Sequence, residues 1–596
     1  MSVDLTSRIR ANQEKLTAEL KSGYDFIVCG SGSSGSVVAR RLAEIPDASV
    51  LLIEAGGWDD VPAVEDAARW PENLGSERDW AFPTRANPHL NGRALLCSMG
   101  KVLGGSSSIN VMAWSRGHKN DWEGFAEAAG DPAWNYDSVL GIYRRIEDWQ
   151  GEPDATRRGS GGEVFVQPTP NPHLVATAMV EAASSIGIPA FADQNGAMME
   201  ADAGAALANV RIRDGKRLSV FRSYVYPWMD RPNLTVLTGT LVTKVLFDGK
   251  RATGVEVVRD GKLEQFQAGC EVVLSLGAIQ TPKILMQSGI GDTGQLRSFD
   301  IGVVQHLPGV GANLQEHVLL AGCVWDHAEP DQFQSFCCEA TFFAKSDPAL
   351  ATPDLQAFVV NGPFLSAELS AHTPAGSAWS MTPGLVRPQS RGQIRLTGAK
   401  PTDPVDIDLN ILSQRVDLRA AMECVRLCRE MGNGAAFRSL TKREACPGPV
   451  GDVELEAFVR NAAVPFWHYT CTAKMGRDDL SVVDGNLRVY GIAGLRIADG
   501  SIMPNVTTGN TMAPCVIIGE RCAEILKADH LCVPPVLNRD GQAVDRRGDA
   551  GQQAPPANSN TGADAAHRDR RSSTSWRLSA ASRTMPGLAA GSTRRE

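Results

Sequence analysis

The sequence predicts an α/β fold of the Rossmann type, to which a second domain is joined. Near the N-terminus the apolar run Tyr24–Cys29, the helix-like stretch Ser36–Glu44 and the apolar run Ser49–Ile53 follow one another. Together they span about thirty residues, the size of a parallel strand–helix–strand crossover. Two later apolar runs, Glu271–Leu276 and Leu495–Ala498, also end at small residues and lead into helix-like segments, as further strands of this sheet would.

A glycine-rich turn joins the first predicted strand to the first predicted helix and matches the pattern GxGxxG. Gly30 permits the tight turn, Gly32 lets a diphosphate approach the main chain, and Gly35 lets helix and strand pack closely. The free N–H groups at the start of the helix favour an anion. Glu54 ends the second strand, where a carboxylate can bind ribose hydroxyls. These features predict a dinucleotide site, although the turn alone does not separate NAD from FAD.

Further along the chain the pattern predicts a hairpin and a helix. Val242–Phe247 and Ala252–Val258 flank an Asp-Gly pair, which is typical of a tight turn, and predict a β-meander on the main sheet. A helix is predicted at Pro282–Gln287, with Thr281 as its N-cap. The stretch from 320 to 390 has mixed short apolar runs and is difficult to assign.

The composition limits the classes of function. Hydrophobic residues make up 43% and charged residues 21%, as in a folded, soluble protein, and the net charge of −9 argues against nucleic acid as a partner. The 13 cysteines form no CxxC pair, so no metal site is expected. Residues 1–22 have the pattern of a polar helical extension without a signal-peptide core, and no apolar run approaches the ~20 residues of a membrane span. We therefore expect a cytoplasmic protein with a disordered, polar tail at 531–596.

Several longer motifs carry a family resemblance, and their order and spacing extend over residues 24–527. The three long motifs are Gly100–Asn110, Gly277–Gly291 and Trp467–Thr511. Two short motifs, Pro308–Leu314 and Ser390–Gly392, lie between the second and the third. This set resembles the glucose–methanol–choline (GMC) family of FAD-dependent alcohol oxidoreductases. The resemblance implies an α/β FAD-binding domain of the Rossmann type and a discontinuous α+β substrate domain built on an antiparallel sheet.

The same resemblance divides the chain. The FAD-binding domain would comprise 23–160, 225–320 and 472–530, and the substrate domain 161–224 and 321–471. Both domains are then discontinuous, and the substrate pocket would lie between them.

The resemblance also assigns residues to FAD. The glycine turn and Glu54 would bind its ADP half, Gly104–Asn110 would lie along the flavin, and Val242 would meet adenine through its backbone. Ile109 stands where some choline-oxidising relatives carry a histidine bonded to FAD, so non-covalent FAD is expected. The full implied set, taken from matching motifs, is Gly30, Gly32, Ser33, Gly35, Glu54, Val102, Gly105, Ser106, Asn110, Val242, Asp499, Gly500, Asn510 and Thr511.

Two catalytic residues follow from the resemblance. The hydroxyl proton must leave as hydride leaves the carbon, since the alkoxide is the better hydride donor, and histidine suits the base. The family's base maps onto His468, and its second residue, His or Asn, is Asn510 here. An amide can hold the alcohol oxygen but cannot take the proton. His317 is expected to belong to a structural turn, next to Glu316, where relatives commonly have Asp.

The implied reaction is oxidation of a primary alcohol, choline-like or aromatic, to the aldehyde by hydride transfer to flavin N5. Either O2 or a quinone-like carrier would reoxidise the flavin. Phe466, Trp467 and Tyr469 either line a pocket for such a substrate or pack in the core. The alternative within the same fold is a hydroxynitrile lyase, which keeps FAD without net redox chemistry.

Overall fold

The structure is a computed structural model and describes residues 3–331, 335–531, 536–537 and 543–544. The predicted tail at 531–596 lies outside the described residues, apart from Leu531 and two two-residue strands. Within the described ranges, none of the helices combines the length and apolar character that a membrane crossing needs.

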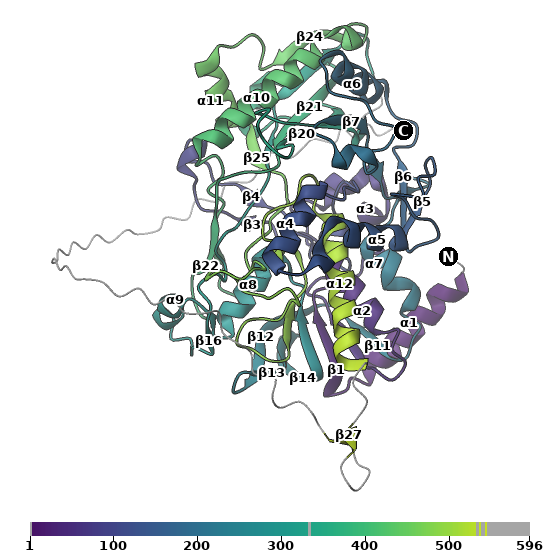
Figure 1. The fold of residues 1–596 in the computed structure, drawn as a ribbon, viewed down its shortest axis with the longest axis vertical. Helices are drawn as coiled ribbons and strands as arrows, with labels where there is room; N and C mark the ends of the chain where they lie inside the picture. The colour runs from purple at the N-terminus through teal and green to yellow at the C-terminus, as the bar shows by residue number, and fades with distance from the viewer. Residues whose placement is uncertain (1–2, 332–334, 532–535, 538–542, 545–596) are drawn as a thin grey trace, which may run out of the picture. The chain divides into compact units, whose positions relative to one another are not determined.

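The first sheet is mainly parallel and contains the predicted strand–helix–strand unit (Figure 1). Its order is β11-β2-β1-β14-β13-β12, and β26 also pairs with β14. The strands with parallel pairing are β1 (Gly23–Cys29), β2 (Val50–Ile53), β11 (Leu234–Leu237), β14 (Lys262–Leu274) and β26 (Leu495–Ile497). In this register Val28 lies opposite Leu52 and Val273, so the carboxyl ends of β1, β2 and β14 meet at one edge.

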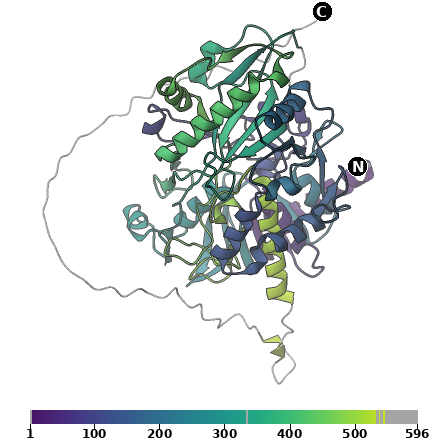
Figure 2. The same cartoon turned by 45° about the horizontal axis from the view of Figure 1, so that its top comes forward.

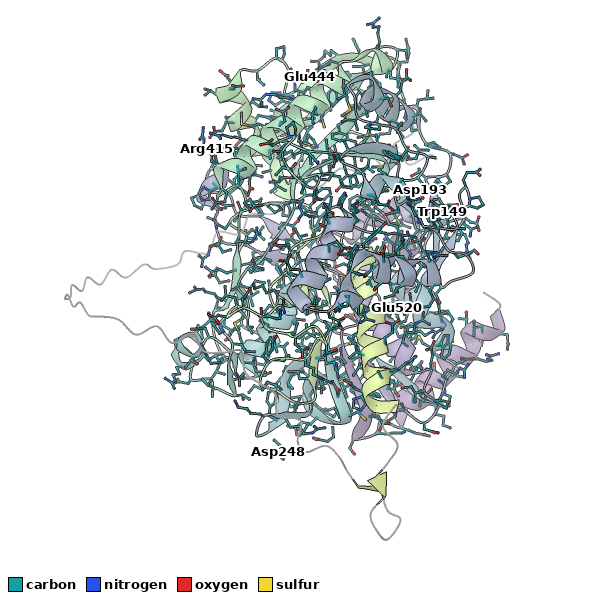
Figure 3. The ribbon with its side chains drawn as sticks, viewed as in Figure 1. Trp149, Asp193, Asp248, Arg415, Glu444 and Glu520 are labelled. Carbon is teal, nitrogen blue, oxygen red and sulfur yellow. The ribbon has the colours of Figure 1, made fainter. Side chains whose placement is uncertain are left out.

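The predicted β-meander extends the same sheet. β12 (Thr240–Asp248) pairs antiparallel with β13 (Arg251–Arg259), which pairs antiparallel with β14. The turn at Asp248, labelled in Figure 3, continues through Gly249 at φ +56°, a left-handed backbone that glycine adopts without cost. The hairpin prediction is confirmed.

Two helices pack against each other beside this sheet, α2 (Ser33–Leu42) and α12 (Met512–Leu531) (Figure 1). A Cβ at Gly519 would lie only 2.7 Å from the Ser34 carbonyl oxygen, so the close approach of the two helices requires glycine. The predicted N-terminal helix is α1 (Val3–Ala18), and its Gln13 amide bonds to the backbone of β11.

The helix after β14 begins earlier than the sequence predicts. α8 spans Gly277–Gln287, so Thr281 lies inside the helix and is not its N-cap. Gly277, at φ +79°, makes the turn out of β14, and its N–H donates to Asp499 Oδ2 at 2.9 Å. Thr281 Oγ1 donates to the same oxygen at 2.6 Å. A carboxylate more than 200 residues away in the chain therefore accepts hydrogen bonds from the N-terminal part of this helix.

The second sheet is antiparallel and has eight strands, in the order β24-β18-β21-β20-β19-β7, with β17 paired to β21 and β25 to β17. Its strands are β7 (Gly204–Leu207), β17 (Val318–Leu320), β18 (Cys323–His327), β19 (Ser335–Ala344), β20 (Leu355–Asn361), β21 (Ala378–Leu385), β24 (Thr441–Cys446) and β25 (Ala463–Pro465). Helices α10 (Arg415–Gly432) and α6 (Leu174–Ser185) pack against it, and Figure 2 shows the green α10 crossing its face.

A three-stranded sheet of β5 (Glu147–Trp149), β6 (Val164–Pro168) and β8 (Asn209–Val210) is anchored by buried charges. Glu147 accepts hydrogen bonds from Arg116 and Arg158, and Arg158 also pairs with Asp193, labelled beside Trp149 in Figure 3. Burial opposes ionisation, yet the two guanidinium groups hold the pKa of Glu147 below its ordinary value.

Candidate functional site

The glycine turn after β1 leaves open space at one glycine only. A Cβ at Gly30 would lie 2.3 Å from the Ser275 carbonyl oxygen, and one at Gly35 would lie 1.9 Å from that of Gly30. A Cβ at Gly32 would meet nothing within 4 Å. Protein packing therefore requires the first and third glycines, whereas the second faces space that a diphosphate can fill at the N-terminus of α2.

Glu54 lies directly beside this turn and is buried. Its carboxylate accepts hydrogen bonds from Ser31 N–H at 3.1 Å, Ser31 Oγ at 2.7 Å and Gly56 N–H at 2.9 Å. Burial raises the pKa of Glu54, and these three donors oppose that shift. The Thr240 N–H donates to the Glu54 carbonyl oxygen at 3.0 Å, which brings the start of β12, and with it Val242, to the end of β2.

A second loop packs against the glycine turn. The Gly104 N–H donates to Ser31 Oγ at 3.1 Å, and a Cβ at Gly105 would lie 2.8 Å from the Cα of Gly32. Inside the loop, Gly105 N–H donates to the Val102 carbonyl oxygen, and Ser106 Oγ accepts from Gly100 N–H. At its end, Asn110 Nδ2 lies 3.2 Å from the sulfur of Met512, the first residue of α12.

Asp499 joins the C-terminal segment to this group. Its carboxylate accepts from Gly277 N–H, Thr281 Oγ1 and, at 2.8 Å, Ser501 N–H. Burial raises the pKa of Asp499. A Cβ at Gly500 would lie 3.4 Å from Cys515 Sγ, and Cys515 N–H donates to the Thr511 carbonyl oxygen at 3.1 Å.

These contacts bring together segments that are far apart in the chain. Ser34, next to Ser33 in the glycine turn, donates its hydroxyl to the Cys515 carbonyl oxygen at 2.6 Å. The open position at Gly32, the start of α2 and the buried Glu54 fit a dinucleotide; Gly32 and the start of α2 would hold its diphosphate, and Glu54 its ribose.

His468 has a side-chain partner at each ring nitrogen. Its Nδ1 lies 2.9 Å from Nδ1 of His317, and its Nε2 lies 3.2 Å from Nδ2 of Asn510. The pairing of β17 with β25, in which Val318 lies opposite Pro465, brings His317 and His468 together. Burial lowers the pKa of His468 to about 3, so this imidazole is neutral at pH 7 and can accept a proton.

Glu316 fixes the backbone around His468. Its carboxylate accepts from Phe466 N–H at 2.9 Å and from His468 N–H at 2.9 Å, on either side of Trp467. Trp467 has φ +62°, a left-handed conformation that a bulky residue adopts only when its surroundings impose it. Glu316 therefore holds a strained turn that presents the His468 ring, while burial raises its own pKa.

The sequence assigned His317 to a structural turn, and sequence reasoning did not predict its contact with His468 at the candidate site. His317 is fully buried, and burial, followed by the repulsion that a protonated His468 would exert, lowers its pKa well below the ordinary value. The only signal in the sequence was the Gln315-Glu316-His317 triplet itself. Its significance depends on the pairing of two strands about 150 residues apart.

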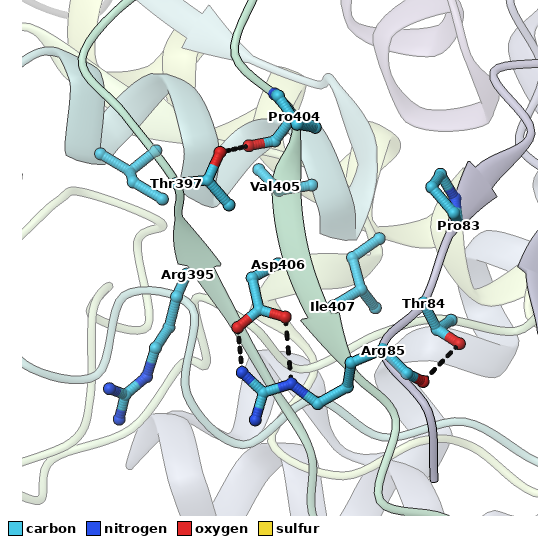
Figure 4. Close-up of a pocket in the computed structure, with 10 residues that line it drawn as sticks. Pro83, Thr84, Arg85, Arg395, Thr397, Pro404, Val405, Asp406 and Ile407 are labelled. Atoms are coloured by element: carbon cyan, nitrogen blue, oxygen red, sulfur yellow. Dashed lines mark hydrogen bonds and ion pairs between the residues drawn. The ribbon is translucent and has the colours of Figure 1, made fainter. Parts of the chain in front are cut away.

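A surface groove of about 480 Å³ lies apart from these residues, between Pro83–Arg85 and the hairpin of β22 (Gln393–Leu396) and β23 (Val405–Asp408) (Figure 4). Arg85 crosses it to pair with Asp406 (Figure 4). None of the residues assigned to cofactor or substrate lines this groove.

Comparison with known proteins agrees with this geometry. Two family models described as GMC oxidoreductase match residues 24–319 and 388–519. An uncharacterized GMC-type oxidoreductase of Mycobacterium tuberculosis is 37% identical over 531 residues, 85% of this chain and 99% of that protein. The chain belongs to the GMC oxidoreductase family. It is therefore an oxidoreductase that acts on alcohols and uses FAD.

Two further relatives show the range within this family. An oxygen-dependent choline dehydrogenase of Stenotrophomonas maltophilia is 36% identical over 540 residues, covering 85% of this chain and 95% of that protein. The crystal structure of pyridoxine 4-oxidase from Mesorbium loti has a TM-score of 0.79 and 32% identity, covering 84% of this chain and 99% of that one. Two relatives with 32–36% identity to this chain are therefore named for different substrates, choline and pyridoxine.

Proposed function

We propose that this GMC oxidoreductase oxidises a primary alcohol to the aldehyde, with His468 as the base and Asn510 as the residue that orients the hydroxyl. The observation that carries the proposal is the neutral, buried His468, whose Nε2 lies 3.2 Å from the Asn510 amide. An alcohol oxygen that lies within hydrogen-bond distance of both groups, and so replaces their direct contact, can donate its proton to Nε2 and accept a hydrogen bond from Nδ2.

Bound FAD supplies the hydride acceptor, flavin N5. The residues proposed to hold it are the glycine turn, Glu54, Val242, the 104–110 loop and the segment around Asp499. We propose that FAD is bound non-covalently, since Ile109 offers no nucleophile. Asn510 Oδ1, the acceptor atom of the orienting side chain, has no hydrogen-bond partner among the described residues.

The two sheets support the proposed domain division of 23–160, 225–320 and 472–530 against 161–224 and 321–471. Every strand of the parallel sheet falls in the first set, and seven of the eight strands of the antiparallel sheet fall in the second. The exception is β17, whose three residues end the 225–320 segment.

The reaction is tested by mixing the purified, FAD-loaded protein with alcohols in the absence of oxygen while the visible flavin absorbance is followed. We expect one of the two classes of primary alcohol, choline-like or aromatic, to bleach the flavin. Readmitted air then shows whether O2 or a quinone-like carrier serves as acceptor. No bleaching by any alcohol would contradict the proposal and favour a lyase.

A further inference from the structure

A separate apolar cluster lies beside the proposed catalytic pair. We call it the Phe466 cluster; its ten buried members are Met198, Met199, Ala206, Ala208, Leu319, Cys338, Phe343, Phe358, Val386 and Phe466. They come from β7, β17, β19, β20 and the segments around them, all parts of the second sheet or its connections.

The Phe466 cluster reaches His468 and Asn510 from two directions. The Phe466 ring stacks on the His468 ring, with centroids 4.8 Å apart and planes inclined by 26°, and meets Phe358 edge-on at 6.2 Å. On the other side, Phe343 Cζ lies 3.1 Å from the place that a Cβ at Gly509 would occupy, next to Asn510. The body of an alcohol held by the catalytic pair would therefore contact apolar side chains.

A second apolar group continues this surface. Ala67, Trp70 and Met112 form it, and Val111 packs against both this group and the Phe466 cluster. The Trp70 ring meets the Trp467 ring edge-on at 6.5 Å. The apolar surface thus extends from Phe466 to Trp467, the residue before His468, and on to Trp70.

Buried carboxylates near this region in the chain already accept hydrogen bonds or pair with cations, and Glu339, beside Cys338, is one of them. Glu316 accepts the backbone N–H groups of Phe466 and His468. Asp121 accepts from the N–H groups of His118 and Thr508 and pairs with Arg387, the neighbour of Val386 in the cluster. Residues 332–337, whose side chains lie outside the description, contain no Asp or Glu.

Magnitudes decide between a cationic and a neutral substrate. Removing a cation from water without a counter-ion costs several kcal/mol. Contact with aromatic faces returns only about 0.5–2 kcal/mol. Burying an apolar body against the cluster is favourable by about 25 cal/mol per Å². The balance favours a substrate without charge.

We infer that the substrate is an uncharged primary alcohol with an apolar body, such as a benzylic alcohol, and not choline. This inference rests on the proposed alcohol oxidation and names its substrate class. It separates this chain from the choline dehydrogenases among its relatives, because Glu316, Asp121 and Glu339, the described carboxylates near the cluster, already have partners and leave none for a quaternary ammonium.

The test compares choline with 3,3-dimethylbutan-1-ol, which has the same shape but carbon in place of the charged nitrogen, and with benzyl alcohol. With the FAD-loaded protein we expect kcat/KM for the neutral isostere and for benzyl alcohol to exceed that for choline by roughly 100-fold or more. Equal or faster reaction with choline would overturn the inference.

A binding measurement keeps the inference testable if the reaction proposal fails. If no alcohol bleaches the flavin, benzyl alcohol must still perturb the flavin spectrum at concentrations where choline does not. A spectral response to choline alone would overturn the inference, whereas absence of bleaching alone contradicts only the reaction.

A variant pair tests the same point from the protein side. Phe358→Glu places a carboxylate in the cluster and should raise the choline-to-isostere ratio of kcat/KM at least tenfold, whereas Phe358→Gln should not. FAD content and melting temperature report whether each variant folds, and an unchanged ratio in a folded Phe358→Glu protein would count against the inference.

Discussion

Nδ1 of His317 lies 2.9 Å from Nδ1 of His468, so one proton is shared between the two rings. The Asn510 Nδ2 amide can only donate to His468 Nε2, which leaves the proton of neutral His468 on Nδ1. That proton then points at Nδ1 of His317, whose own proton is on Nε2. In the proposed mechanism His317 thereby fixes the tautomer in which His468 Nε2 carries no proton and can take one from the alcohol.

Replacing His317 should lower the rate of flavin reduction with little effect on KM. His317→Phe removes the acceptor for the Nδ1 proton, and we expect the rate to fall about 10- to 100-fold. His317→Asn can still accept this proton through its side-chain oxygen and should retain more of the rate. Anaerobic stopped-flow measurements of both variants check this, and equal, wild-type rates in both would contradict the role.

Glu316 is predicted to stabilise the His468 turn through its carboxylate. Glu316→Ala leaves the N–H groups of Phe466 and His468 buried and unpaired, at a cost of about 1–3 kcal/mol each. Glu316→Gln keeps one acceptor oxygen and should lose less. Thermal unfolding of the FAD-loaded proteins measures the difference, and a Glu316→Ala protein as stable as the wild type would argue against it.

The activity should persist at acidic pH. The base works only when unprotonated, so a histidine of ordinary pKa near 6.5 would lose activity as the pH falls through 6.5. Burial lowers the pKa of His468 to about 3, which moves this loss to a lower pH. We expect kcat/KM for a neutral alcohol to be nearly unchanged between pH 8 and pH 5. A decline centred near pH 6.5 would show that the base titrates normally.

Gly32 and Gly35 should respond differently to the same substitution. Gly32→Ala meets no protein atom and keeps an ordinary φ of −63°, so the protein should fold but bind FAD about tenfold or more weakly. Gly35→Ala places a methyl group 1.9 Å from the Gly30 carbonyl oxygen and should prevent stable folding. FAD titration and unfolding of the apoproteins distinguish the two. Wild-type FAD affinity in Gly32→Ala would exclude a diphosphate at this position.

Short-range pattern predicted the parallel sheet but not the antiparallel one. β1, α2 and β2 follow from apolar runs and a glycine turn within thirty-odd residues. β20 and β21 escaped notice because all their residues are buried, which removes the alternation that marks a strand. The predicted start of α8 was also wrong, because the helix begins at Gly277, whose N–H donates to Asp499, a residue far along the chain.

The candidate site likewise contains residues that the sequence assigned and one contact that it did not predict. His468 and Asn510 lie 42 residues apart and were assigned through motifs of the family, and the structure brings their side chains into contact. The contact between His317 and His468 spans 151 residues and arises from strand pairing, which no local pattern encodes.

The most direct test of the central claim is the anaerobic rate of flavin bleaching by benzyl alcohol in the wild type and in His468→Gln. Glutamine can keep hydrogen bonds to its neighbours but cannot take the hydroxyl proton. The account predicts full bleaching in the wild type and a rate about 10²- to 10⁴-fold lower in the variant, with equal FAD content. Equal rates in two proteins with the same FAD content would contradict the assignment of His468 as the base.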